Sequence, residues 1–449
     1  MNGFPAGFVW GASTSAYQIE GAPLADGAGP SNWHRFSHQP GNIKHDHTGD
    51  IACDHYHRFR DDVALMSELG INSYRFSISW SRVLPEGRGA RNPKGLDFYA
   101  RLVDELLARN IMPNVTLYHW DLPAALDERG GWLNADIADW FADYAVLMYR
   151  TLGDRVPQWA TLNEPWVNVD AGYVHGVHAP GLRAARNGPI ASHNLLRAHG
   201  TAVQAFRAEL GQRIGIVVNL EPKYPASESP LDLAATQRAD AYWNRQYLDP
   251  VFFGRYPEEM RDIYQDAWPE FSDVDLALIR QPVDFVGINY YKRGVVRDDP
   301  DAIPARDGYV RQSQSPHTDL DWEVYPSGLT RILQWVRDRY GDVALYVTEN
   351  GAAFTDPPAP VHGRVHDPQR IDYLAGHLLA ARAAIENGVD LRGYYVWSLL
   401  DNFEWAEGYT KRFGIVHVDF DTLARTPKSS AHFYAEVVRS NGASLERGR

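Results

Sequence analysis

Short runs of β-branched and aromatic residues alternate along the chain with longer stretches in which apolar residues recur at helical spacing. The short runs predict strands at Phe8–Ala12, Ser73–Ser79, Pro113–Tyr118, Gln158–Leu162, Ile214–Asn219, Asp284–Tyr290, Leu345–Thr348 and Gly393–Ser398. The longer stretches predict helices at Asp61–Leu69, Leu96–Arg109, Ile137–Leu152, His193–Leu210, Leu329–Arg339 and Arg370–Asn387. Strands that alternate with helices favour a parallel sheet, and eight strand–helix units in one chain favour a closed (β/α)8 TIM barrel.

No low-complexity linker divides the 449 residues, so we expect a single barrel domain over residues 1–449. Pro- and Gly-rich patches predict long loops at Ala22–Gly41, Pro222–Pro230, Asp298–Ser315 and Asp356–Gly363. In such barrels the loops that follow the strands line the active face, so functional side chains are expected there.

The amino-acid composition and net charge limit the classes of molecule that the protein is expected to bind. Hydrophobic residues make up 44% and charged residues 22%, as in ordinary globular proteins, and the formal net charge is −13. An acidic surface repels phosphate backbones and anionic lipids, so we expect no nucleic-acid or membrane partner. The start of the chain shows no secretory signal, no apolar run is long enough to span a bilayer, and we expect a cytoplasmic protein. The sequence does not decide between a monomer and a homo-oligomer.

Two glutamates occupy matching places at the ends of predicted strands. Glu164 follows Gln158–Leu162, and Glu349 follows Leu345–Thr348. Each stands beside an asparagine and is followed by a Pro or Gly that ends the strand. One such glutamate alone would be an ordinary strand-end carboxylate, but two in equivalent positions favour an active site.

A carboxylate pair of this kind suits the cleavage of a glycosidic bond. One carboxyl group must hold a proton for the leaving oxygen, while the other must be ionised to stabilise or attack the anomeric centre. Repulsion between the two charges raises the pKa of one group above that of the other. The pair alone therefore indicates a glycosidase-like site.

The complete set of motifs resembles glycoside hydrolase family 1, the β-glucosidase family. Besides the segments around the two glutamates, the resemblance is carried by Phe4-Pro5, Trp10–Gly21, Tyr74–Trp80, Tyr118–Pro123, Trp397–Trp405 and Arg412–Gly414. Any one of these motifs would be weak, but their order from Phe4 to Gly414 is specific.

The resemblance implies roles for the catalytic residues. Glu349 would be the nucleophile and Glu164 the general acid/base, with the carboxyl groups about 5 Å apart and the anomeric configuration retained. Arg75 would keep Glu349 ionised, and Tyr291 would orient it through a hydrogen bond. Asn163 would hold the 2-hydroxyl of the sugar. We expect a bell-shaped pH profile with an optimum between roughly pH 5 and 7.

The resemblance also implies a sugar pocket. Its expected binding residues are Gln18, His119, Trp120, Asn163, Asn289, Trp397, Glu404, Trp405 and Phe413. Glu404 would accept hydrogen bonds from neutral hydroxyls and would repel a phosphate, so we expect an unphosphorylated sugar. On the aglycone side, the candidates are Trp166, Asp170, Ala171, Tyr173, His178 and Trp322.

We therefore predict a retaining exo-β-glucosidase that acts on disaccharides, short oligosaccharides or aryl glucosides. β-Galactosidase, β-fucosidase and transglycosylation activities are expected beside it. The alternatives are a β-glycosidase whose main substrate is a galactoside or fucoside, and a non-catalytic sugar-binding barrel, which loss of either glutamate would have indicated.

A dense group of His and Asp side chains between His45 and His57 resembles a metal site. We expect no metal there and no cofactor elsewhere, because zinc-binding spacings are absent from the sequence and its single cysteine cannot form a thiolate site. We expect His55 and Arg58 instead to start the helix that runs through Asp61–Leu69.

Overall fold

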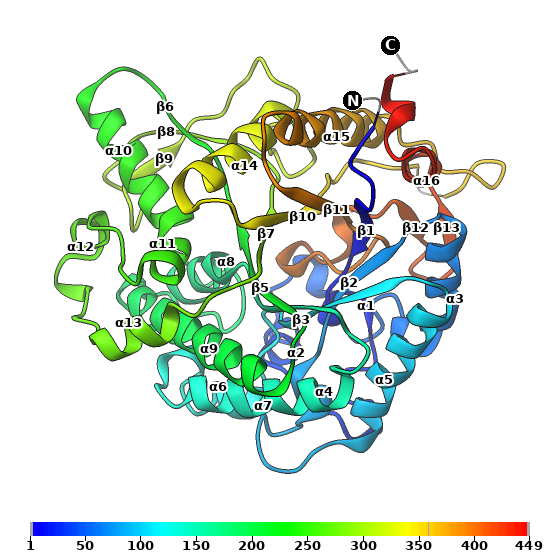
Figure 1. The fold of residues 1–449 in the computed structure, drawn as a ribbon, viewed down its shortest axis with the longest axis horizontal. Helices are drawn as coiled ribbons and strands as arrows, with labels where there is room; N and C mark the ends of the chain where they lie inside the picture. Colours follow the sequence, from blue (N-terminus) through cyan, green and yellow to red (C-terminus); the bar gives the residue numbers. More distant parts are fainter. Residues whose placement is uncertain (1–2, 358, 447–449) are drawn as a thin grey trace.

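The computed structural model describes residues 3–357 and 359–446 of the chain. Within these residues eight parallel strands close into a barrel in the order β1-β11-β10-β7-β5-β4-β3-β2. The barrel strands are β1 (Val9–Ser13), β2 (Ser73–Ser77), β3 (Met112–Tyr118), β4 (Gln158–Asn163), β5 (Arg213–Asn219), β7 (Phe285–Asn289), β10 (Ala344–Asn350) and β11 (Leu391–Trp397). Figure 1 shows these strands at the centre of the molecule with helices around them. Each predicted strand overlaps one of them, so the predicted (β/α)8 fold is confirmed.

The six predicted helices are present; Ile137–Leu152 has the predicted ends, and the ends of the other five are shifted. They are α3 (His55–Glu68), α5 (Pro93–Ala108), α7 (Ile137–Leu152), α9 (Gly188–Glu209), α14 (Pro326–Tyr340) and α15 (Pro368–Glu386). Helix α3 begins at His55, as expected for the helix that runs through Asp61–Leu69, and His55 and Tyr56 are both buried in its first turn. His55 Nδ1 lies 2.8 Å from the carboxylate of Asp62, two turns along the same helix, which gives one nitrogen of the buried ring a partner.

Ten further helices in the described residues were not predicted. They are α1 (Ala16–Ile19), α2 (Asn32–Ser37), α4 (Trp80–Val83), α6 (Ala124–Asp127), α8 (Pro165–Val169), α10 (Pro230–Asp240), α11 (Gln246–Phe253), α12 (Glu259–Tyr264), α13 (Asp273–Ile279) and α16 (Ser429–Arg439). Many are a single turn or two. Helix α10 is longer, but it has no continuous apolar stripe, since Leu231 and Leu233 are exposed while only Ala235 and Ala239 are buried.

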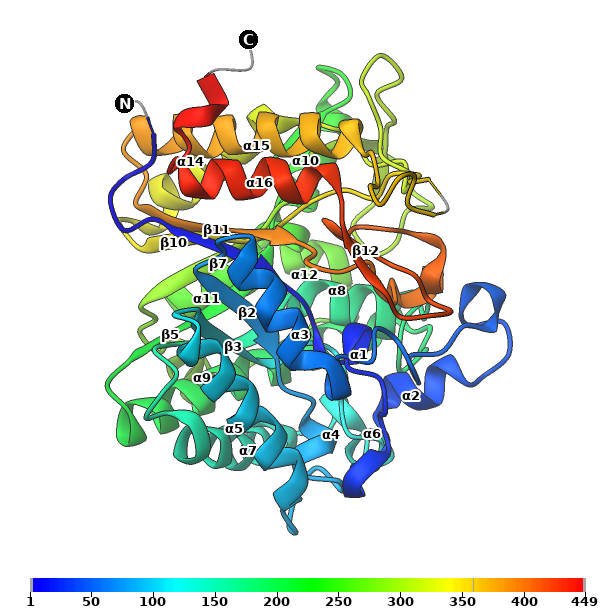
Figure 2. The ribbon, with the colours of Figure 1, turned by 90° about the vertical axis from the view of Figure 1, so that its right-hand side faces the viewer.

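Three of the predicted loops contain secondary structure. Helix α2 lies within the first of them, β6 (Lys223–Pro225) within the second and β9 (Asp307–Tyr309) within the third. Strands β6 and β9 flank β8 (Gly294–Asp298) in a small sheet, and β12 (Val416–Val418) pairs with β13 (Arg425–Pro427). Figure 2 shows α1, α2 and β12 on one side of the barrel, where the strands end. Pro358, in the predicted loop Asp356–Gly363, lies outside the described residues.

The barrel interior is packed with side chains and leaves no room for another at Gly11. A Cβ atom at Gly11 would lie 2.1 Å from the ring of Tyr395, so only glycine fits against that ring. The Tyr395 hydroxyl lies 2.8 Å from Ser73 Oγ and accepts a hydrogen bond from Asn114. These contacts fill the barrel toward the amino-terminal ends of its strands, so a functional site is expected at the carboxyl-terminal ends.

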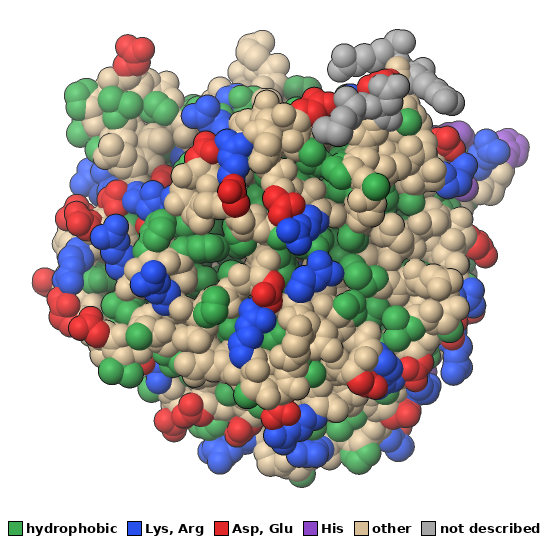
Figure 3. Space-filling model, in the orientation of Figure 1, with side chains coloured by type: hydrophobic (Ala, Val, Ile, Leu, Met, Phe, Trp, Pro, Cys, Tyr) green, Lys and Arg blue, Asp and Glu red, His purple; other side chains and the backbone are tan. Residues whose placement is uncertain are grey.

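The two ends of the described chain meet beside β1. The backbone N–H of Phe4 donates to the carbonyl of Asn441 across 2.9 Å, and Trp10 Nε1 donates to the Asn441 side chain across 3.0 Å. On the face shown in Figure 3, Lys and Arg side chains are interspersed with Asp and Glu. Among the described helices, none combines the length and the apolar character needed to cross a membrane.

Candidate active site

Both predicted glutamates lie at the same end of the barrel, next to irregularities in their strands. Pairing of β4 with β5 shifts register before Asn163, and pairing of β10 with β7 shifts register before Glu349. Such bulges redirect the side chains that follow them. Glu164 then adopts left-handed backbone angles (φ 45°, ψ 61°), and Pro165 begins α8 immediately after it. With the barrel strands counted in chain order, Glu164 follows the fourth strand and Glu349 lies in the seventh.

Glu349 is buried and held by two donors. Arg75 Nη1 donates to its Oε1 across 2.6 Å, and the Tyr291 hydroxyl donates to its Oε2 across 2.6 Å. Both carboxylate oxygens are therefore held by groups that favour the ionised form.

Glu164 is equally buried but has a different partner. Asn289 Nδ2 donates to Glu164 Oε1 across 2.6 Å, while the Asn289 carbonyl oxygen accepts a hydrogen bond from the Thr348 hydroxyl across 2.7 Å. Thr348 thus fixes which end of the Asn289 amide faces Glu164. Asn289, which the resemblance placed among the sugar-binding residues, is bonded directly to the second glutamate in this structure.

The different partners separate the two carboxyl groups electrostatically. Burial raises the pKa of Glu164 well above its ordinary value, and the charge of Glu349 raises that pKa further. Burial also raises the pKa of Glu349, but Arg75 and then Tyr291 oppose that rise. Proton loss therefore occurs first at Glu349, which leaves Glu164 as the protonated member of the coupled pair.

Asn163 connects this pair to the sugar pocket. Its Oδ1 accepts a hydrogen bond from Arg75 Nη2 across 2.6 Å, so its Nδ2 is the atom that donates to His119 Nε2 across 3.0 Å. Burial lowers the pKa of His119 well below its ordinary value, so the ring is neutral and carries its proton on Nδ1. That buried Nδ1 has no hydrogen-bond partner among the described residues and is left as a donor for a ligand.

A pocket of about 400 Å³ opens above the two glutamates. The predicted residues that line it are His119, Trp120, Glu164, Trp166, His178, Asn289, Tyr291, Trp322, Glu349, Trp397, Glu404, Trp405 and Phe413. Trp120 Nε1 donates to the backbone carbonyl of Asn163 across 2.9 Å, which fixes one wall to the end of β4. Aromatic faces with a few placed polar groups are the composition expected of a small-molecule site.

Other predicted residues lie behind this lining. Gln18 is fully buried, and its Nε2 donates to the carbonyl of Phe403 across 3.0 Å and approaches Glu404 Oε2 at 3.4 Å. Burial, with the charges of Glu349 and Glu407, raises the pKa of Glu404 to about 8. Glu404 can therefore hold a proton near neutral pH, and its predicted role as a carboxylate acceptor requires that proton to leave.

Three candidates for the aglycone side are not part of the pocket lining found among the described residues: Asp170, Ala171 and Tyr173. Asp170 accepts a hydrogen bond from Tyr242 across 2.6 Å, and the buried Tyr173 hydroxyl accepts one from the backbone of Trp132 across 3.2 Å. Both side chains point into neighbouring structure rather than into the pocket.

The pocket lining also includes residues that the sequence did not indicate. They are Val167, Asn219, Leu220, Glu221, Trp243, Lys292, Leu320, Ala406 and Glu407. Trp243 packs on Trp166 with ring centroids 3.5 Å apart, and Lys223 Nζ lies 3.8 Å from the Trp243 ring centroid. The Glu221 carboxylate forms ion pairs with Lys223 Nζ at 2.7 Å and with Lys292 Nζ at 3.4 Å. Only the richness of the chain in Trp could have signalled Trp243, because it follows the unpredicted helix α10.

The His and Asp residues between His45 and His57 are spread over different contacts. His55 bonds Asp62, His57 bonds Asp54, and His47 accepts a hydrogen bond from the backbone of Tyr409 across 3.1 Å. Only Asp50 of this stretch belongs to the group of potential metal ligands found among the described residues.

Comparisons with known proteins agree with this geometry. The sequence model of Glycosyl hydrolase family 1 matches residues 1–443. The chain is 51% identical to β-glucosidase A of Thermotoga maritima over 98% of both proteins, and 44% identical to a bifunctional β-D-glucosidase/β-D-fucosidase of Bifidobacterium breve over 98% of this chain and 99% of that protein. A solved structure of the Thermotoga maritima β-glucosidase in complex with deoxynojirimycin superposes with a TM-score of 0.96 at 51% identity, covering 98% of this chain and 100% of that one.

Proposed function

We propose, for a chain that belongs to glycosyl hydrolase family 1, that it is a retaining exo-β-glucosidase with Glu349 as nucleophile and Glu164 as acid/base. The observation that carries the assignment of roles is the asymmetry of the buried pair. Arg75 and Tyr291 both bind Glu349, whereas Glu164 has the neutral amide of Asn289. The relatives named above are a β-glucosidase and a bifunctional β-D-glucosidase/β-D-fucosidase, and both names include glucosidase activity, which supports a β-glucoside as the main substrate.

In the first step Glu349 attacks the anomeric carbon, and the bond from that carbon to the leaving oxygen breaks. The proton of Glu164 moves to the leaving oxygen, so the aglycone departs as a neutral alcohol. The product at the enzyme is a glucosyl ester of Glu349, and Glu164 is left as a carboxylate. Asn163, which Arg75 and His119 hold from two sides, is placed to bind the 2-hydroxyl during this step.

In the second step water enters on the face that the aglycone has left. The ester at Glu349 carries no charge, so the pKa of Glu164 falls and Glu164 can take a proton from the water. The water oxygen bonds to the anomeric carbon, the ester bond breaks, and Glu349 returns to its ionised form. Two inversions at one carbon leave the configuration unchanged.

The pocket supports a neutral sugar at the nonreducing end. Its ring would stack on Trp397, with hydroxyls on His119 and Glu404. A sugar phosphate would bring a dianion into the pocket of the ionised Glu349 and would oppose ionisation of Glu404, so an unphosphorylated glucoside is favoured. We further propose disaccharides, short oligosaccharides and aryl glucosides as substrates, galactosides and fucosides as weaker ones, transglycosylation when a sugar replaces water, and a cytoplasmic location.

Azide rescue of two variants tests the roles. Glu349→Gly should lose roughly 10⁴-fold or more of its activity on an aryl β-glucoside, while Glu270→Gly, at an exposed carboxylate paired with Arg261, should keep wild-type activity. Azide in place of the missing nucleophile should give the α-glucosyl azide. In Glu164→Ala, azide should instead attack the glucosyl ester and give the β-glucosyl azide.

If Glu349→Gly gave the β-glucosyl azide and Glu164→Ala gave the α-glucosyl azide, Glu164 would be the nucleophile and Glu349 the acid/base. Full activity of Glu349→Gly would refute the proposal. A panel of aryl β-glucoside, galactoside and fucoside then tests the substrate. A kcat/KM clearly higher for galactoside or fucoside than for glucoside would favour the alternative main substrate.

A further inference from the structure

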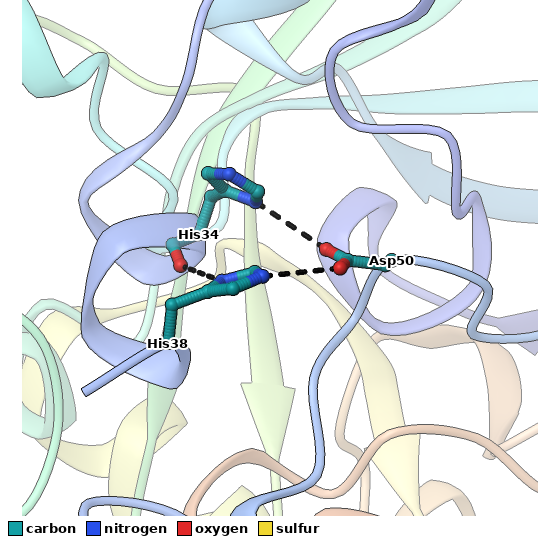
Figure 4. A group of neighbouring side chains, drawn as sticks. All are labelled: His34, His38 and Asp50. Carbon is teal, nitrogen blue, oxygen red and sulfur yellow. Dashed lines mark hydrogen bonds and ion pairs between the residues drawn. The ribbon is translucent and has the colours of Figure 1, made fainter. Parts of the chain in front are cut away.

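Three potential metal ligands meet outside the sugar pocket. His34 and His38 lie four residues apart along α2 and its end, and Asp50 comes from the segment before α3. Figure 4 shows both imidazole rings directed toward the Asp50 carboxylate. His34 Nδ1 lies 3.4 Å from Asp50 Oδ1, and His38 Nε2 lies 3.1 Å from Asp50 Oδ2. The three ligand atoms lie within 4.8 Å of one another.

A contact with the backbone determines which nitrogen of the His38 ring carries the proton and which has a free lone pair. His38 Nδ1 lies 2.6 Å from the carbonyl oxygen of His34, and a carbonyl oxygen only accepts hydrogen bonds. Nδ1 must therefore carry a proton, and in a neutral ring Nε2 does not. A lone pair then faces the negative carboxylate, which is repulsive unless a cation lies between them. A hydrogen bond from the second ring nitrogen to a backbone carbonyl is also how metal-binding histidines are commonly oriented.

The second pair of facing atoms, His34 Nδ1 and Asp50 Oδ1, lacks hydrogen bonds among the residues that the structure describes. Both atoms are buried. Buried polar atoms without a partner are costly, and a shared cation would satisfy both atoms at once.

We propose that His34, His38 and Asp50 form a binding site for one divalent transition-metal ion, of which Zn²⁺ fits best. Two imidazole nitrogens and a carboxylate are typical zinc ligands, whereas Mg²⁺ and Ca²⁺ prefer oxygen ligands alone. Zn–N and Zn–O bonds of about 2.0–2.1 Å place tetrahedral ligand atoms about 3.3 Å apart. His34 Nδ1 lies 3.4 Å from Asp50 Oδ1 and His38 Nε2 lies 3.1 Å from Asp50 Oδ2, so each imidazole is close to that spacing from one of the two carboxylate oxygens. His38 and Asp50 are each 42% exposed, so solvent can supply the fourth ligand.

The bound ion would join two segments that support the sugar pocket from behind. Trp33, next to His34, packs on the pocket residue Trp405 with ring centroids 4.4 Å apart. On the other side, the Asp50 carbonyl accepts a hydrogen bond from the backbone of Ala22 across 2.7 Å. The expected effect is that Zn²⁺ stabilises this part of the active face, with no role in bond cleavage.

Titration of the chelator-treated full chain with Zn²⁺, followed by calorimetry at pH 7.5, tests the site. We expect one saturable site per chain that weakens by about 10-fold or more in His38→Ala and in Asp50→Asn. Asp50→Asn keeps the shape of the side chain but removes its charge. His432→Ala, at an exposed histidine of α16, should bind Zn²⁺ as the wild type does. Activity on an aryl β-glucoside confirms that each variant is folded.

Thermal unfolding supplies a second readout. Zn²⁺ should raise the midpoint of the wild type and of His432→Ala, but not that of His38→Ala or Asp50→Asn. A protonated His38 that bridges the two oxygens without a metal would instead predict no saturable Zn²⁺ binding. That result, or binding that survives unchanged in folded His38→Ala and Asp50→Asn, would overturn the proposal.

Discussion

The guanidinium of Arg75 donates to Glu349 across 2.6 Å, and both side chains are almost completely buried. Because this contact favours the ionised carboxylate, its loss should raise the pKa of Glu349. Activity requires ionised Glu349, so the acid limb of the kcat/KM profile of Arg75→Met should move to higher pH by about one unit or more. Arg75→Lys, which keeps the charge, should shift it less. An acid limb that stays in place in Arg75→Met would show that Arg75 does not control Glu349.

The Tyr291 hydroxyl gives Glu349 its second hydrogen bond, across 2.6 Å. Tyr291→Phe removes that donor and leaves the ring. A hydrogen bond to a charged group contributes about 1.5–3 kcal/mol, so kcat/KM should fall roughly 10-fold to 150-fold. The acid limb should move upward as with Arg75→Met, because this donor also lowers the pKa of Glu349. Loss of activity without any change in the pH profile would indicate a role in packing only.

Burial raises the pKa of Glu404 to about 8. Sugar hydroxyls that donate to Glu404 favour its ionised form, so binding should lower that pKa and release protons into the buffer. Calorimetry of glucose binding at pH 7 in two buffers with different ionisation enthalpies would detect this release. It should be reduced in Glu404→Gln, and equal release by the variant would place the titrating group elsewhere.

Trp243 and Trp166 form one aromatic surface on the aglycone side. If a second sugar stacks there, Trp243→Ala should raise KM for cellobiose more than for a small aryl glucoside. The loss should be about 1 kcal/mol, or roughly 5-fold, because one stacking face is removed. Trp268→Ala, at a tryptophan that does not line the pocket, is the control. An equal rise of KM for both substrates would contradict a second sugar site at this surface.

The barrel could be predicted because its strands are buried on both faces and read as short apolar runs. Ile214–Asn219, for example, differs from β5 by one residue. The positions of Glu164 and Glu349 followed from the same reasoning, since the carboxyl ends of parallel strands meet at one face. The roles of neighbouring residues came from the family resemblance.

The remaining features depend on three-dimensional contacts that no periodicity records. The Asn289 amide is oriented by Thr348, and the His119 proton is fixed through Asn163 and Arg75. Trp243 reaches the pocket from beyond a helix without an apolar stripe. His34 and Asp50 meet only because the loop between them folds back.

The most direct test of the account is to trap the covalent intermediate with an activated 2-deoxy-2-fluoro-β-glucoside. Fluorine at C2 destabilises the oxocarbenium-like transition states of both steps, while a good leaving group restores the first, so the glucosyl ester accumulates. Mass spectrometry of the digested protein should find one fluoroglucosyl group per chain, on the peptide that contains Glu349. A label on Glu164, or turnover through an inverted product with no labelled peptide, would contradict Glu349 as the nucleophile.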